Sequence, residues 1–158
     1  MTRDWSVRRL GEEDWARYRA VRLSMLLDAP EAYGSTFARE VGLAEEDWRE
    51  RTGGSTFLAE REDGLPLGAA TLLRREDHDP EIVAMWVAGH VRGGGVADAL
   101  VDACRDLAVA GGAGLVRLHV MLANPRAVAC YTRLGFVRDG ACADVPGCSR
   151  MHWTRGTG

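Results

Sequence analysis

Residues 85–97 read Met-Trp-Val-Ala-Gly-His-Val-Arg-Gly-Gly-Gly-Val-Ala and lead directly into a helical pattern. The stretch predicts a strand joined to a helix through an arginine and three glycines. A helix start has backbone N–H groups without internal partners and the positive end of the helix dipole, and glycines let phosphates approach these groups closely. The stretch therefore predicts either a pyrophosphate site or a surface turn between strand and helix.

Apolar periodicity on both sides of this stretch predicts an α/β fold, a mixed sheet with helices on its faces. Helices are predicted over 14–27, 43–51, 96–110 and 125–134, and strands over 5–10, 55–60, 67–74, 81–87, 115–122, 136–139 and 150–153. No repeat or linker interrupts the pattern, and 158 residues is an ordinary length for one domain. We therefore expect a single domain over residues 1–158.

All 20 basic residues are arginine. Without lysine the chain has no Walker A loop, no Schiff-base lysine for pyridoxal phosphate and no protein-kinase lysine. The glycine cluster also departs from the dinucleotide fingerprint, because Asp98 stands where glycine or alanine is required.

The charge and hydropathy patterns bear on partners and location. The net charge is −3 and the arginines are interspersed with acids, so no nucleic-acid partner is predicted. The apolar stretches are shorter than the ~20 residues of a membrane span, so no membrane association is predicted either. Because the N-terminus lacks a secretory pattern, we expect a cytoplasmic protein.

The four cysteines show no C-x-x-C spacing, and no H-E-x-x-H motif is present, so the sequence predicts no metal site. Cys142 and Cys148 flank a Pro-Gly turn and could meet across a hairpin. In a reducing compartment, however, free thiols are expected. The prediction is two free thiols.

Two motifs follow one another between Glu81 and Phe136. The first has the form (Q/R)-x-x-G-x-(G/A) and the second the form N-x-x-A-x-x-x-Y-x-x-x-G-F. Their residues are Arg92, Gly95 and Ala97, then Asn124, Ala127, Tyr131, Gly135 and Phe136. In both motifs and in their order the chain resembles the GNAT superfamily of acyl-CoA-dependent N-acyltransferases.

The resemblance implies a mostly antiparallel central sheet of about six to seven strands with about four helices. Strands four and five would splay apart around acetyl-CoA, the acyl donor. Homodimers are common among relatives, so a homodimer is predicted. The implied acetyl-CoA contacts are Met85, Trp86, Val87, Arg92, Gly93, Gly94, Gly95, Val96, Ala97, Asn124, Ala127, Tyr131 and Arg133.

N-Acetyl transfer sets requirements that can be compared with the residues present. An alkylamine of pKa ~10.4 is protonated at neutral pH, so forming the nucleophile costs roughly 4 to 5 kcal/mol and a base helps. A backbone N–H, by resemblance near Val87, would stabilise the oxyanion. The departing thiolate needs an acid, and Tyr131 is the candidate. Alternatively, Tyr131 only buries its ring and Asn124 only caps a helix.

Several residues compete as general base. His119 lies five residues before Asn124, where relatives that acetylate ribosomal-protein N-termini have a glutamate. Glu81 resembles the position of the glutamate base of histone acetyltransferases. The other possibilities are Asp144, Glu31 or ordered water.

The resemblance predicts an N-acetyltransferase that acts by direct attack of a primary amine, with a small-molecule amine as the first hypothesis. A protein N-terminus or lysine side chain is the second, and a non-catalytic acyl-CoA-binding sensor or regulatory subunit is the third. The acceptor would contact the segment 29–37, the second helix and the loop 141–150. The candidate contacts are Glu31, Tyr33, Phe37 and Asp144, with Glu40 adding negative charge.

Overall fold

The computed structural model describes residues 3–156. In this part of the chain a seven-stranded sheet of order β1-β2-β3-β4-β5-β7-β6 is combined with helices α1 to α5. The bounds are β1 Trp5–Arg9, α1 Trp15–Asp28, α2 Phe37–Glu40, α3 Glu45–Thr52, β2 Thr56–Arg61, β3 Pro66–Leu73, β4 Glu81–Val87, α4 Val96–Ala110, β5 Leu115–Met121, α5 Pro125–Arg133, β6 Val137–Ala141 and β7 Cys148–Thr154. The mixed α/β prediction is confirmed, and the four-residue α2 is an addition to it.

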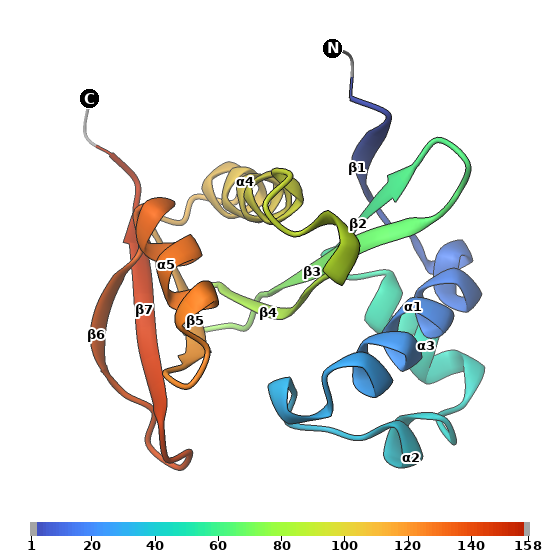
Figure 1. Cartoon of the computed structure of the whole chain (residues 1–158), viewed down its shortest axis with the longest axis horizontal. Coiled ribbons are helices and arrows are strands. Elements are labelled where there is room, and N and C mark those ends of the chain that lie inside the picture. The colour runs from blue at the N-terminus through green and yellow to red at the C-terminus, as the bar shows by residue number, and fades with distance from the viewer. Residues whose placement is uncertain (1–2, 157–158) are drawn as a thin grey trace. The chain divides into compact units, whose positions relative to one another are not determined.

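The chain forms two compact units (Figure 1). The first consists of residues up to Thr71 together with Ala84–Leu100. The second consists of Leu72–Val83 together with residues from Val101 onward.

Strands β1, β2 and β3 pair antiparallel in the first unit, and β1 is an edge strand. Helices α1 and α3 pack against each other (Figure 1), with the ring of Tyr18 edge-on to that of Trp48. These rings belong to a hydrophobic cluster, and burial of its apolar surface is the main force that holds the two helices together. The buried members of the cluster are Leu10, Tyr18, Val21, Leu23, Met25, Leu26, Trp48, Leu58 and Ala69.

The second unit contains an antiparallel ladder of β5, β7 and β6, with the start of β4 parallel to β5. Side chains alternate along β5: Val116, Leu118 and Val120 are buried. Arg117 and His119 therefore point to the opposite face of the sheet, since successive residues of a strand alternate. The parallel pairing joins Glu81 to Arg117 and Ile82 to Leu118, and the predicted splay farther along these strands stays a prediction.

The carboxyl-terminal part of α4 also belongs to the second unit, where Val101, Cys104 and Ala108 are buried. Burial raises the pKa of the Cys104 thiol to about 12. Cys104 is therefore a protonated core residue and not a nucleophile.

Cys142 and Cys148 form a disulfide, so the prediction of two free thiols is wrong. The β6–β7 hairpin brings their Cα atoms to 5.3 Å, and the Cys142 N–H donates to the Cys148 carbonyl at 3.0 Å. The prediction rested on the compartment, whereas hairpin closure decides how close the two sulfur atoms come.

None of the helices formed by residues 3–156 is both long enough and apolar enough to cross a membrane.

Candidate active site

The glycine-rich stretch forms the predicted link between a strand and a helix in the first unit. A 3-10 turn at Gly89–Val91 follows β4, and α4 begins at Val96, whose side chain is buried. Gly93 and Gly95 have φ of +85° and +90°, a region that L side chains rarely adopt. The loop therefore needs glycine at both positions, and it leads into the amino-terminal end of a 15-residue helix.

A close approach of three elements positions this loop. At Gly68 of β3, a Cβ atom would lie 2.7 Å from the Trp86 carbonyl oxygen and 2.9 Å from a Val96 methyl carbon. The Ala88 N–H donates to the Leu67 carbonyl at 2.8 Å. Only glycine lets β3 pass this close to β4 and to the start of α4.

Strand β4 is distorted just before the residues that are predicted to contact acetyl-CoA. Ala84 has φ of +54°, which is rare for a residue other than glycine. Beyond it, the Tyr33 hydroxyl donates to the Met85 carbonyl at 3.0 Å, and the Trp86 ring N–H donates to Asp28 at 3.1 Å. Burial raises the pKa of Tyr33 to about 12, so its hydroxyl stays protonated and remains a donor.

The structure places the predicted acceptor contacts in different environments. Tyr33 and Phe37 are half-buried and pack against the core of the first unit, whereas Glu31 and Asp144 are exposed. The prediction that Glu40 adds negative charge for the acceptor is wrong. It is buried and paired with two arginines, so its charge is neutralised inside the first unit.

The Glu40 carboxylate accepts two hydrogen bonds from Arg22, both at 3.0 Å, and one from Arg51 at 2.7 Å. Burial by itself would raise the pKa of Glu40, but hydrogen bonds from Arg22, Ser35 and Arg51 outweigh burial and lower it to about 2. The guanidinium of Arg22 also lies 5.1 Å from the centre of the Tyr33 ring. This ion cluster holds α1, α2 and α3 together.

Helix α5 in the second unit contains the second motif, and Asn124 caps it. The Asn124 side-chain oxygen accepts from the Ala127 N–H at 3.1 Å, and Pro125 occupies the first turn. Tyr131 is buried, with its ring edge-on to Phe136 at 5.9 Å between centroids. Gly135 follows the end of the helix with φ of +96°. The structural roles of Asn124 and Tyr131 are thus present, whereas a catalytic role for Tyr131 stays a prediction.

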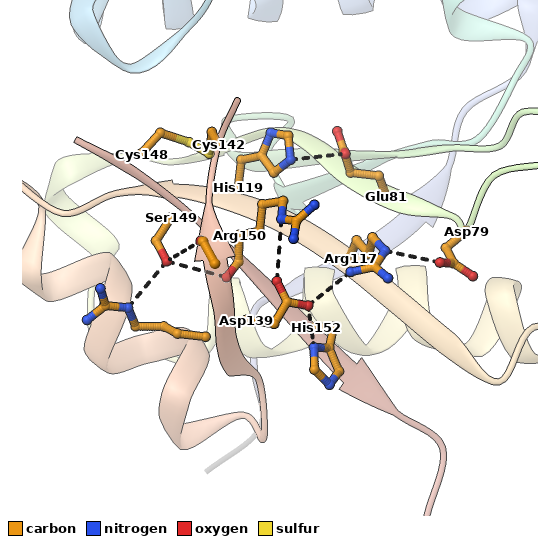
Figure 2. A network of polar contacts seen from close by, with 12 residues as sticks. Asp79, Glu81, Arg117, His119, Asp139, Cys142, Cys148, Ser149, Arg150 and His152 are labelled. Carbon is orange, nitrogen blue, oxygen red and sulfur yellow. Dashed lines mark hydrogen bonds and ion pairs between the residues drawn. A yellow bond between two sulfur atoms is a disulfide. The ribbon is translucent and has the colours of Figure 1, made fainter. Parts of the chain in front are cut away.

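The two leading candidates for general base lie together. His119 Nε2 is 3.7 Å from a Glu81 carboxylate oxygen, on the face of β5 opposite to its buried residues (Figure 2). The His119 side chain is 47% exposed and that of Glu81 19% exposed. The two residues therefore form a carboxylate–imidazole pair in which the histidine is open to a substrate.

An ion cluster that the sequence did not predict continues on this face. Asp139 accepts from His152 Nδ1 at 2.6 Å and from Arg117 at 3.0 Å, and Arg150 lies 3.6 Å away (Figure 2). Arg117 also bonds Asp79 at 3.0 Å. Burial would raise the pKa of Asp139, but the bonds from His152 and Arg117 outweigh it and lower the pKa.

Two other histidines, His78 and His90, are exposed. The signal that could have found the ion cluster is the alternation of charged residues at Arg117 and His119 in β5 and at Arg150 and His152 in β7. The strand register that aligns them is a tertiary property.

Solved structures share this fold. A GCN5-related N-acetyltransferase from Kribbella flavida is 24% identical with a TM-score of 0.73, and the alignment covers 96% of this chain and 98% of that one. The PaiA N-acetyltransferase from Thermoplasma acidophilum, solved in complex with coenzyme A, is 15% identical with a TM-score of 0.74. The alignment covers 98% of this chain and 100% of that one. Nourseothricin acetyltransferase is 28% identical with a TM-score of 0.58, and the alignment covers 63% of this chain and 64% of that one.

The fold and the two motifs define an acyl-CoA-dependent acyltransferase. Residues 18–136 match the model of the acetyltransferase (GNAT) family, so the chain belongs to this family and is an acetyl-CoA-dependent N-acetyltransferase. No curated protein sequence shows a significant match to the chain.

Proposed function

We propose that the protein transfers the acetyl group of acetyl-CoA to a primary amine of a small molecule by direct attack. The observation that carries the mechanism is the His119–Glu81 pair. Two candidate bases that compete in the sequence lie at ion-pair distance in the fold. They can therefore act as one unit.

In this proposal His119 is the general base and Glu81 is the positioning residue. The imidazole accepts the proton that the attacking amine must lose, because a neutral imidazole has a ring nitrogen with a free lone pair and histidine is the side chain that most often serves as a general base. The Glu81 carboxylate orients the ring and stabilises the imidazolium that forms. The half-exposed His119 side chain is accessible to an amine from solvent.

The remaining roles follow the family motifs. The loop from Arg92 to Ala97 binds the pyrophosphate, and Met85, Trp86 and Val87 contact the pantetheine and acyl group through the β4 backbone. Residues Asn124, Ala127 and Arg133 of the α5 segment also contact the cofactor. Tyr131 protonates the departing thiolate, and the edge contact with Phe136 holds its ring. This reaction requires no metal.

A small-molecule acceptor is supported by the resemblance to nourseothricin acetyltransferase, a protein named for a small-molecule substrate. The exposed carboxylates of Glu31 and Asp144 suit a cationic amine. The homodimer and the cytoplasmic location stay predictions.

The first test is calorimetric titration with acetyl-CoA, with the double variant Arg92→Ala, Gly95→Glu as the control. We expect micromolar binding that this variant loses, since a glutamate at φ of +90° strains the loop and repels phosphate. Equal binding by the variant would contradict the assignment of the loop. Turnover is then measured with a panel of amines, and binding without turnover across the panel would favour a sensor.

The base is tested by His119→Ala, with His78→Ala as the matched control in an exposed loop. We expect kcat to fall by roughly 10²-fold or more, which is the usual contribution of a general base. Added imidazole should restore part of the lost rate in His119→Ala, because it replaces the missing base. Glu81→Gln should also lower kcat, but imidazole should not rescue it. An unchanged kcat in His119→Ala would refute the assignment.

A further inference from the structure

Three metal-binding side chains converge on the sheet face of the second unit that carries His119. One ring nitrogen of His119 and the sulfur atoms of Cys142 and Cys148 all lie within 4.8 Å of one another. They come from β5, from the residue after β6 and from the start of β7. Figure 2 shows the imidazole beside the disulfide.

The strand register explains this convergence. His119 pairs with Arg150, and Cys148 lies two residues before Arg150, so the His119 and Cys148 side chains are diagonal neighbours on one face. The hairpin then sets Cys142 against Cys148 through the hydrogen bond between Cys142 N–H and Cys148 C=O. All three ligands are therefore fixed by backbone pairing.

We propose that reduction of the Cys142–Cys148 disulfide creates a binding site for one soft divalent cation, with Zn²⁺ as the ion that the donors suit best. Two thiolates and one imidazole form a known zinc donor set, in which water completes a tetrahedron. Sulfur atoms at 2.3 Å from a tetrahedral zinc lie about 3.8 Å apart. A ring nitrogen about 2.0 Å from the same zinc would lie about 3.6 Å from each sulfur atom. The imidazole nitrogen, now within 4.8 Å of both sulfur atoms, therefore moves closer by up to about 1.2 Å, while the two bonded sulfur atoms move apart.

The chemistry balances with a dithiol as reductant. Two thiol–disulfide exchanges leave Cys142 and Cys148 as thiols and the reductant as its disulfide. On binding Zn²⁺, each thiol loses one proton to solvent and forms a sulfur–zinc bond, and neutral His119 donates a lone pair. No further oxidant or electron donor is needed.

The surroundings of the three ligands favour a metal. With Nδ1 as the zinc ligand, the Glu81 carboxylate, 3.7 Å from Nε2, would lie beside the other ring nitrogen, as the carboxylate does in carboxylate–histidine–zinc sites. Cys148 is buried and Cys142 is half-buried, whereas His119 is exposed and gives the ion access. Sequence spacing does not reveal this arrangement, because His119 belongs to another strand than the two cysteines.

Metal binding by itself is independent of the proposed function, but one consequence rests on it. A zinc-bound His119 cannot accept a proton from the amine. The reduced enzyme should therefore be inhibited by Zn²⁺, whereas the oxidised enzyme should not respond through this site.

The test uses the full chain, reduced with a dithiol, freed of reductant under anaerobic conditions and titrated with Co²⁺ as a spectroscopic probe. We expect one equivalent of Co²⁺ to give thiolate-to-cobalt charge-transfer bands and the visible bands of a tetrahedral site, both displaced by Zn²⁺. The oxidised chain has the same sequence and should give neither. Cys148→Ser should lose the charge-transfer intensity, and His119→Ala should bind at least tenfold more weakly.

The controls are Cys130→Ser and His78→Ala, which keep the three ligands and should bind like the wild type. Far-UV circular dichroism confirms that each variant is folded. A reduced wild-type chain without the charge-transfer bands would overturn the proposal, as would bands that persist in Cys148→Ser or in the oxidised chain. A chain that binds Zn²⁺ but acetylates no amine would refute the proposed function and leave the metal site intact.

Discussion

Replacing Glu40 by glutamine tests whether the buried ion cluster of the first unit is structural. The side chain is 1% exposed, and Arg22 and Arg51 together donate three hydrogen bonds to it. Its pKa falls from an ordinary 4.5 to about 2. At 1.36 kcal/mol per pKa unit, this corresponds to about 3 kcal/mol of folding free energy at pH 7.

The pH dependence follows from the sign of this shift. A carboxyl with a lowered folded-state pKa contributes its full stabilisation above pH 4.5 and loses it as the pH falls toward 2. About 1 kcal/mol of the contribution remains at pH 3. The stability difference between wild type and Glu40→Gln should therefore shrink by about 2 kcal/mol between pH 7 and pH 3.

The assay is urea denaturation followed by circular dichroism at both pH values. Glu45→Gln is the matched control, because Glu45 forms an exposed ion pair with Arg49. This substitution should lower the free energy of unfolding by less than about 0.5 kcal/mol. An equal effect of the two substitutions at pH 7 would refute the reasoning, as would a difference that does not change with pH. A raised KM for a cationic amine in a folded Glu40→Gln variant would instead support a role of Glu40 in binding the acceptor.

Three further outcomes are expected. Asn124→Ala removes the cap that accepts from Ala127 and should lower the free energy of unfolding by about 1 kcal/mol in urea titrations; no change would contradict the cap. Asp139→Asn should lower the free energy of unfolding by about 1 kcal/mol at pH 7, because it removes a charged acceptor from His152. The loss should be smaller below pH 4, and a loss that does not depend on pH would contradict this account. Tyr131→Phe keeps the buried ring and should lower kcat by about 10²-fold with calorimetric acetyl-CoA affinity unchanged; an unaltered kcat would exclude the catalytic acid.

Much of the fold could be predicted because it is encoded in local patterns. Apolar periodicity predicted α4 with its observed bounds, and the helix predicted over 125–134 agrees with α5 to within one residue. The short helix α2 was missed because four residues are too few to show a helical period. Motif spacing predicted the glycine loop and the family.

The sequence by itself determined the order of helices and strands, the two motifs and hence the acetyltransferase family, because these depend on residues that are neighbours along the chain. The tertiary structure decided which distant side chains meet. It joined His119 to Glu81, enclosed Glu40 between Arg22 and Arg51, and closed the disulfide beside His119. Such contacts depend on helix packing and strand register, and a shift of one residue in register would turn the side chains of a strand to the opposite face of the sheet.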